Sequence, residues 1–315
     1  PAWQTSEGSY TKYAHLAEQL YRELVAPAEQ NLKHVQRLII APDGILNYLP
    51  FESLLRKSAP ASGIDFSSLP YLTNDFEIEY APSSTVFAAL KIHEGAMEAP
   101  NELLAFADPG KPAAEPARGK TRSSRGDYPP LPNARLEVEG IARLFPPEKV
   151  AIFEGQAASE EKLKKMKLTE YKRLHFASHG VIDEQNPEFS SILLSTPQKG
   201  AEDGYLMTQE IFDLKLNADL VVLSACKTGL GRQIRGEGIM GLSRAFLCAG
   251  ASSVLASLWN VPDASTAQFM TDFYRSMVTK GMSKTEALKK ARLELIRSGK
   301  FSHPYYWAPF VLIGN

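Results

Sequence analysis

Two reactive side chains follow apolar runs of the sequence. His179 comes directly after the run 173–178, and Cys226 comes directly after the run 219–225. An imidazole beside a thiol promotes formation of the thiolate, which attacks a carbonyl carbon, and the imidazolium then protonates the leaving amine. The backbone N–H groups of Gly180 and Cys226 are candidates for an oxyanion hole. The pattern predicts cleavage of an acyl bond by His179 and Cys226.

The same two residues also allow a purely structural interpretation. A cysteine at the end of an apolar strand is commonly a small buried hydrophobic residue, and a histidine there often only packs. Chemistry therefore depends on whether the two runs are neighbouring strands. In open α/β sheets the carboxyl ends of parallel strands meet at one edge, where ligands bind. If the runs are neighbours, both side chains face one crevice.

The elements around these runs predict such a sheet. Ser159 is expected to cap one helix, and Ser283 with Glu286 forms a capping box for another. Apolar strands separated by amphipathic helices are typical of an α/β fold with a central, mostly parallel sheet covered on both faces. The strands expected are 37–41, 76–80, 103–107, 149–153, 173–178, 219–225, 251–257 and 309–313, and the main helices are 134–145, 159–167, 238–249, 264–279 and 284–297.

The chain is expected to divide into two parts around a linker. Residues 109–130 are rich in Pro, Gly, Ser and basic residues and read as a flexible linker. This gives an N-terminal part, 1–108, and a C-terminal part, 131–315. Near the start, 10–25 reads as a helix with one apolar face. The residues expected on that face are Tyr13, Leu16, Leu20 and Leu24.

Composition limits the classes of partner. The 315 residues carry a formal net charge of -1, which argues against a direct nucleic-acid or anionic-membrane partner. The two cysteines, Cys226 and Cys248, make a disulfide framework unlikely and predict a reducing, cytoplasmic location. Cys248 lies in an apolar helical segment, so we expect it in the core. There is no signal peptide or 18-residue apolar run, and the start at Pro1 suggests a piece of a longer protein.

Two cofactor interpretations are weaker. Glycines at 229–238 superficially resemble a phosphate-binding loop, but GxxxxGK[ST] is absent and Ile234 replaces the third glycine of GxGxxG. A mobile loop beside an active site is the better interpretation. His175 and His179 are four residues apart, which would suit a metal on a helix, yet they lie in a predicted strand. The sequence therefore predicts no metal and no cofactor.

Longer motifs connect these residues to a known family. The segments LHFASHG (174–180), ADLVVLSACKTGLG (218–231), 236–263 and HPYYWAPFVLIG (303–314) resemble the CHAT family of caspase-like, separase-related peptidases. Segments 38–54 and 130–145 resemble its earlier parts, so the resemblance covers nearly the whole chain. The family's histidine and cysteine match His179 and Cys226, although Ser178 stands where threonine is more common. Their spacing of 47 is close to that of caspases.

The resemblance implies an architecture and an activity. It implies a caspase-like three-layer sandwich with about six strands in an active C-terminal half, beside a degenerate, pseudo-protease N-terminal half. It also implies a cysteine endopeptidase of a longer bacterial protein, gated by an upstream repeat or sensor region, often of tetratricopeptide repeats. The partners would be a protein substrate and that activating region. The alternative is a catalytically silent interaction module with the same fold.

The resemblance also indicates where substrate binds. In caspase-like folds the loop after the strand 251–257 lines the specificity pocket, and LWNVPD is similar to a separase segment in which an aspartate selects arginine. This points to Asp263, with Trp259 and Ser257, and to Asp183 as a second acidic candidate. The expected preference is for cleavage after basic residues. Alternatively, Asp263 caps the helix that follows it.

Overall fold

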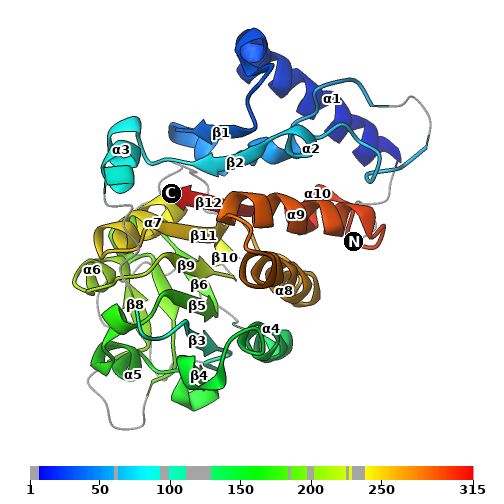
Figure 1. The fold of residues 1–315 in the computed structure, drawn as a ribbon. Helices are drawn as coiled ribbons and strands as arrows, with labels where there is room; N and C mark the ends of the chain where they lie inside the picture. The colour runs from blue at the N-terminus through cyan, green and yellow to red at the C-terminus, as the bar shows by residue number, and fades with distance from the viewer. Residues whose placement is uncertain are drawn as a thin grey trace.

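The computed structural model describes residues 7–59, 63–92, 99–110, 128, 130–183, 186–196, 202–224, 227–228 and 238–314. Its centre is one eight-stranded sheet (Figure 1). All pairings in this sheet are parallel except that of β11 with β12. In spatial order the strands are β1 (Arg37–Ile40), β2 (Glu77–Tyr80), β12 (Phe310–Gly314), β11 (Ser253–Ser257), β9 (Leu220–Leu223), β5 (Arg173–Ala177), β3 (Leu103–Ala107) and β4 (Val150–Glu154).

Helices cover both faces of this sheet, because its central strands are apolar on both sides. Every residue of β3, β5, β9, β11 and β12 is buried. One face carries α4 (Pro132–Ala142), α8 (Asp263–Lys280) and α9 (Lys284–Arg297), and the other carries α5 (Glu160–Lys165), α6 (Thr208–Phe212) and α7 (Gly238–Cys248) (Figure 1). This confirms the expected α/β fold with a central, mostly parallel sheet.

A second, smaller sheet was not expected from the sequence. It contains β10 (Lys227–Thr228), β6 (Gly180–Ile182), β7 (Ser191–Leu193) and β8 (Tyr205–Met207), in that order. Strands of two or three residues are too short to show a period, which is why the sequence pattern missed them. The small sheet follows directly from β5 and β9. The other helices are α1 (Glu7–Leu24), α2 (Leu72–Asp75), α3 (Ser84–Ile92) and α10 (Pro304–Trp307), with 3-10 helices at Ala26–Leu32, Gly44–Tyr48, Phe51–Ser53, Pro147–Lys149, Gly155–Ala157, Leu168–Glu170 and Pro187–Phe189.

Two details of helix burial correct the sequence expectations. Helix α1 buries Tyr10, Ala14, Ala17 and Tyr21, whereas Leu16 is 45% exposed and Leu24 is 37% exposed. Of the expected face, Tyr13 and Leu20 are half-buried and pack against the core, so the prediction was wrong for Leu16 and Leu24. Cys248 is exposed, not in the core, because it is the last residue of α7 and lies just before the turn at Gly250.

The N-terminal residues are part of the same sheet as the rest of the chain. Strands β1 and β2 extend it beyond β12, and β3, which ends the N-terminal part expected from the sequence, lies between β4 and β5. The degenerate, pseudo-protease character of this part is not shown by the arrangement. Most of the expected linker 109–130 lies outside the described residues. No helix among the residues that the structure describes is long and apolar enough to cross a membrane.

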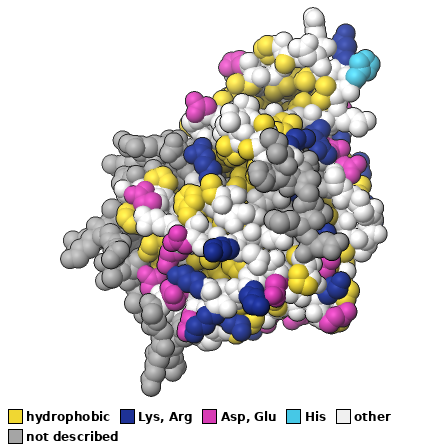
Figure 2. Space-filling model, turned by 60° about the vertical axis from the view of Figure 1, so that its left-hand side comes forward, with side chains coloured by type: hydrophobic (Ala, Val, Ile, Leu, Met, Phe, Trp, Pro, Cys, Tyr) yellow, Lys and Arg dark blue, Asp and Glu magenta, His cyan; other side chains and the backbone are white. Residues whose placement is uncertain are grey.

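Exposed apolar side chains are concentrated in the N-terminal part. Seven of the nine large hydrophobic residues that are exposed in the described portion precede residue 108. Hydrophobic side chains gather in the upper part of the face shown in Figure 2, whereas charges of both signs are interspersed below. The seven residues are Leu16, Leu24, Val35, Ile39, Ile45, Ile64 and Val86.

Candidate active site

The strands that lead to His179 and Cys226 are neighbours in the sheet. β5 and β9 are parallel, and their paired residues, such as Phe176 and Leu223, are 47 positions apart. The backbone N–H of Ser224 donates to the carbonyl of Phe176 at 3.1 Å, so the pairing continues to the strand ends. Beyond them, β10 pairs with β6 through Lys227 and Val181. Cys226 lies outside the described residues. Ser224 before it and Lys227 after it are placed against Phe176 and Val181, on either side of His179.

His179 itself lies in a well-anchored turn between β5 and β6. It is 8% exposed, and its carbonyl oxygen accepts a hydrogen bond from the N–H of Leu193 at 2.8 Å. The hydroxyl of the preceding Ser178 donates to the Leu193 carbonyl. Gly180 begins β6 and pairs with Ile192. These bonds fix the backbone on both sides of the imidazole.

An aromatic ring from the expected linker contacts this imidazole. The ring centroids of Tyr128 and His179 are 5.5 Å apart, with an angle of 45° between the planes. Burial raises the pKa of the Tyr128 hydroxyl above its usual value. The C-terminal end of the segment 109–130 thus reaches the candidate active site.

A cavity of about 330 Å³ lies beside His179. Its walls come from three places that are distant in sequence: the start of α4, the carboxyl ends of β5 and β9, and the loop that leads into α8. Residues 130–134 with Glu137 form the first wall, Ala177, His179 and Ser224 the second, and residues 260–263 with Thr266 and Tyr305 the third. A cavity at the carboxyl edge of a parallel sheet is where ligands bind in such folds.

Asp263 is one of the residues that line this cavity. It is the first residue of α8, and one of its carboxylate oxygens, Oδ2, accepts a hydrogen bond from the backbone N–H of Asn133 at 2.7 Å. Asn133 is at the start of α4, whose own N-cap, Leu131, makes no side-chain capping bond. The alternative that Asp263 caps its own helix is wrong, because α8 has Pro262 as its N-cap and no side-chain capping bond. The carboxylate instead caps α4.

The other expected substrate-binding residues are not among the lining residues of this cavity. The hydroxyl of Ser257 donates to the carbonyl of Trp259 at 2.7 Å, and the indole N–H of Trp259 donates to the carbonyl of Tyr305 at 3.0 Å. They shape the loop that presents Asp263. Asp183 lies at the end of β6, where its carboxylate accepts a hydrogen bond from the N–H of Asn186 at 2.9 Å.

A buried polar chain beneath the cavity was missed by the sequence pattern. His175 is fully buried; its Nε2 is 2.7 Å from Oε1 of Glu137, and its Nδ1 is 3.2 Å from the hydroxyl of Tyr274. Both ring nitrogens therefore have protein partners, which leaves neither for a metal. Burial raises the pKa of the Tyr274 hydroxyl. The available signal was a histidine in the middle of a largely apolar strand, since a buried polar side chain needs hydrogen-bond partners.

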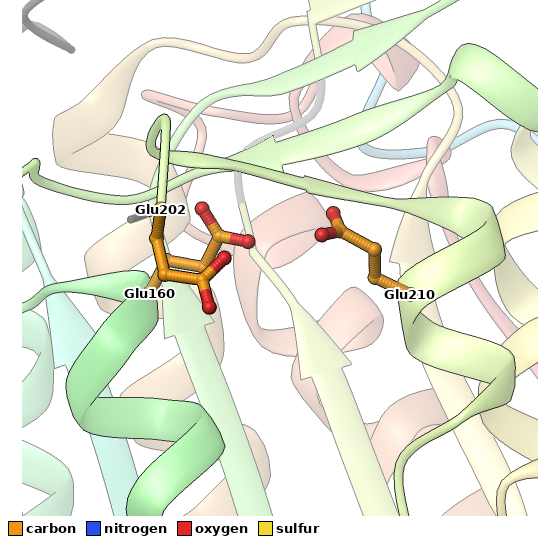
Figure 3. A group of neighbouring side chains, drawn as sticks. All are labelled: Glu160, Glu202 and Glu210. Atoms are coloured by element: carbon orange, nitrogen blue, oxygen red, sulfur yellow. The ribbon is translucent and has the colours of Figure 1, made fainter. Parts of the chain in front are cut away.

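A group of three carboxylates lies on the opposite side of the sheet from α4. Glu160, Glu202 and Glu210 point toward one another (Figure 3), each with an oxygen within 4.8 Å of the others. The ammonium of Lys164 contacts all three, at 2.7, 2.6 and 2.8 Å, so an internal cation already occupies the group. Burial, with the nearby Glu210 charge, raises the pKa of Glu160 to about 7. The cluster ties α5 to α6 and to the segment before β8.

Comparison with known proteins identifies the family. The model of the CHAT domain matches residues 14–315. The chain belongs to the CHAT domain family. Human tetratricopeptide repeat protein 28 is 29% identical over 336 residues, which cover 94% of this chain and 13% of that protein. The mouse protein of the same name is 28% identical over the same length. The CHAT chain thus spans a small part of the length of these relatives.

Solved structures share the fold of this CHAT domain. The Arg-specific cysteine proteinase gingipain R superimposes with a TM-score of 0.54 at 9% identity, covering 98% of this chain and 67% of that one. The pro- and mature-domain complex of RgpB from Porphyromonas gingivalis gives a TM-score of 0.52 at 10% identity, with 98% and 69% covered. Separase of Saccharomyces cerevisiae, in complex with securin, gives 0.50 at 16% identity, with 82% and 16% covered. These likenesses confirm the caspase-like fold.

Proposed function

We propose that this CHAT domain is a cysteine endopeptidase in which His179 is the general base and Cys226 the nucleophile. The observation that carries the proposal is the register of β5 and β9. Their paired residues are 47 positions apart, and His179 and Cys226 are separated by the same number of residues. Both therefore follow equivalent points on adjacent parallel strands, and His179 and Ser224 line a cavity of side-chain size.

The reaction would proceed through a thioacyl-enzyme. His179 takes the thiol proton, and the sulfur of Cys226 forms a bond to the carbonyl carbon of the substrate. The C–N bond then breaks as the imidazolium gives its proton to the leaving amine. Water next attacks the thioester, with His179 again as base, to release the carboxylic acid and the thiol. The N–H groups of Gly180 and Cys226 would stabilise the oxyanion in both steps, and no cofactor is needed.

The cavity supports a preference for basic residues before the cut. Asp263 contributes a carboxylate, and in the described part of the chain no lysine or arginine lines the cavity. A partly buried carboxylate favours a cationic guest over an acidic one, and arginine matches its geometry best. Gingipain R, which shares the fold, is an Arg-specific cysteine proteinase. We extend the proposal to cleavage after arginine or lysine, with Asp263 as a specificity residue.

Regulation by another region is part of the proposal. The human relative is a tetratricopeptide repeat protein of which this chain covers 13%, which supports an upstream repeat or sensor region as the activating partner. Residues 1–108 would act as the supporting, pseudo-protease half beside the active half, 131–315, and a reducing compartment such as the cytoplasm would keep the thiol available.

Internally quenched peptides that differ only at the residue before the cut test this function. The chain is expected to cleave peptides with arginine or lysine there, and not those with aspartate. Cys226→Ala should abolish cleavage while the melting temperature stays the same. Robust cleavage by that variant would refute the mechanism. If no peptide is cleaved, even in the presence of the upstream region, the silent interaction module becomes the better description.

A further inference from the structure

Glu137 is a buried carboxylate that lines the cavity, and the proposed mechanism assigns it no role. It lies on α4, is 1% exposed and lines the cavity together with Asp263. Beneath it lies His175, whose Nε2 is 2.7 Å from Oε1 of Glu137 and whose Nδ1 is 3.2 Å from the hydroxyl of Tyr274. No residue in the described ranges donates a hydrogen bond to Oε2 of Glu137.

The two carboxylates of the cavity differ in how far their charge is offset. Asp263 accepts the N–H of Asn133 at the positive end of α4, where the helix dipole is equivalent to about half a unit charge. Glu137 is beyond the first turn of the same helix, where this effect has fallen off. Among the residues that the structure describes, no lysine or arginine lines the cavity. Among the described lining residues, Glu137 is therefore the carboxylate that no helix terminus, lysine or arginine compensates.

The apolar residues of the cavity indicate which kind of group would compensate the charge of Glu137. Leu131, Ala134, Ala177 and Val261 are apolar lining residues. A guest that fits them has an apolar stem and a cationic end, which is the construction of lysine and arginine side chains. The volume of about 330 Å³ is at the lower end of ligand sites, near 300 Å³, and suits one long side chain. An acidic guest would face two like charges.

We propose that Glu137 is a second specificity-determining residue, which binds the cationic end of the substrate side chain together with Asp263. His175 and Tyr274 are the positioning residues that hold Glu137 in place. The inference rests on the proposed peptidase function, because it names the substrate class of that site. It adds a residue of α4 to the pocket that the loop before α8 supplies.

Binding without turnover tests this role. In the Cys226→Ala background, calorimetry compares two peptides that differ only in arginine or citrulline, which has the same shape and no charge. Glu137→Gln keeps an oxygen that accepts from His175 but removes the charge. We expect it to weaken binding of the arginine peptide about tenfold, because a charge-assisted hydrogen bond becomes a neutral one, and to leave the citrulline peptide within about twofold.

Matched variants keep the test decisive. Glu139→Gln, on the same helix, removes an exposed charge that pairs with Arg143 at 3.4 Å, and it should change neither affinity. Asp263→Asn should retain part of the preference for arginine over citrulline if Glu137 contributes. That measurement does not require a Glu137 variant to fold. Glu137→Asp should retain more of the preference than Glu137→Gln.

The outcomes separate this inference from the peptidase proposal. Unchanged arginine affinity in folded Glu137→Gln, or no residual preference in Asp263→Asn, would overturn the role of Glu137 even in an active peptidase. Failure of the Cys226→Ala chain to bind either peptide would overturn it as well. If the parent chain cleaves nothing but Glu137→Gln selectively weakens binding of the arginine peptide, the subsite stands and the peptidase proposal fails.

Discussion

A fully buried ion pair joins the N-terminal part to the rest of the CHAT domain, and neutralising one partner should be costly. Nη2 of Arg292 is 2.7 Å from Oε1 of Glu52 and 2.7 Å from the carbonyl oxygen of Phe310, and both charged side chains are 0% exposed. The hydroxyl of Tyr80 donates to Oε2 of Glu52 at 2.6 Å. Nε and Nη1 of Arg292 have no hydrogen-bond partner among the described residues. The guanidinium thus depends on Glu52 for charge compensation.

Glu52→Gln removes that compensation and leaves a buried, unpaired cation. Breaking a buried ion pair in this way costs about 3–5 kcal/mol. Urea unfolding, followed by tryptophan fluorescence and by far-ultraviolet circular dichroism, should show a loss of that size in the free energy of unfolding. Because Glu52 and Tyr80 belong to the N-terminal part and Arg292 to α9, amide exchange in β2 should accelerate more than exchange in β5.

Two controls separate the effect of the lost charge from that of the substitution itself. Glu139→Gln, in an exposed pair, should cost about 1 kcal/mol or less. The double variant Glu52→Gln/Arg292→Met removes both charges and should recover much of the loss. A free energy of unfolding of Glu52→Gln within about 1 kcal/mol of the parent would refute the reasoning, because the pair would then contribute no more than a surface pair.

Three further predictions concern stability. In the folded state the pKa of Glu160 is raised to about 7, so between pH 4.5 and 7 it holds a proton that the unfolded chain has released. The free energy of unfolding should therefore fall on the order of 2 kcal/mol as the pH rises across this window, and Glu160→Gln should flatten this dependence. Equal slopes for the parent and the variant in urea unfolding at several pH values would contradict the prediction. Gly250 has φ +111° and an added Cβ would lie 2.4 Å from the carbonyl oxygen of Leu216, so Gly250→Ala should cost about 2 kcal/mol or more; an unchanged melting temperature would argue against that geometry. Ser283→Ala removes the capping bond to the N–H of Glu286 and should cost about 1 kcal/mol by urea unfolding, and no loss would mean that the cap is dispensable.

The sequence predicted elements well where local chemistry decides their limits. The strand 103–107 and the helix 284–297 have the expected bounds, the second because Ser283 and Glu286 form the capping box that starts it. Ser159 likewise accepts the N–H of Lys162, as expected of a cap. The apolar runs also predicted the strands β5 and β9. These features depend on residues close together in the chain.

Features that depend on distant residues were not visible in the sequence. The partner of Asp263 is the backbone of Asn133, 130 residues away, so its capping role could be assigned only from the tertiary structure. The contacts of His175 with Glu137 of α4 and Tyr274 of α8 likewise join residues that are distant in the sequence. The prediction for Leu16 and Leu24 of α1 was wrong because hydrophobicity alone favours leucine, whereas packing selected tyrosine and alanine.

Labelling with an arginine-containing acyloxymethyl ketone, read by intact mass and peptide mapping, tests the central claim most directly. Such a reagent alkylates a thiolate that is activated beside a site which binds arginine. The chain contains two cysteines, and Cys248 is exposed, so it serves as an internal control for simple accessibility. The account predicts one adduct, on Cys226, that is lost in His179→Ala. Labelling of Cys248 at the same rate, or no adduct on Cys226, would contradict it.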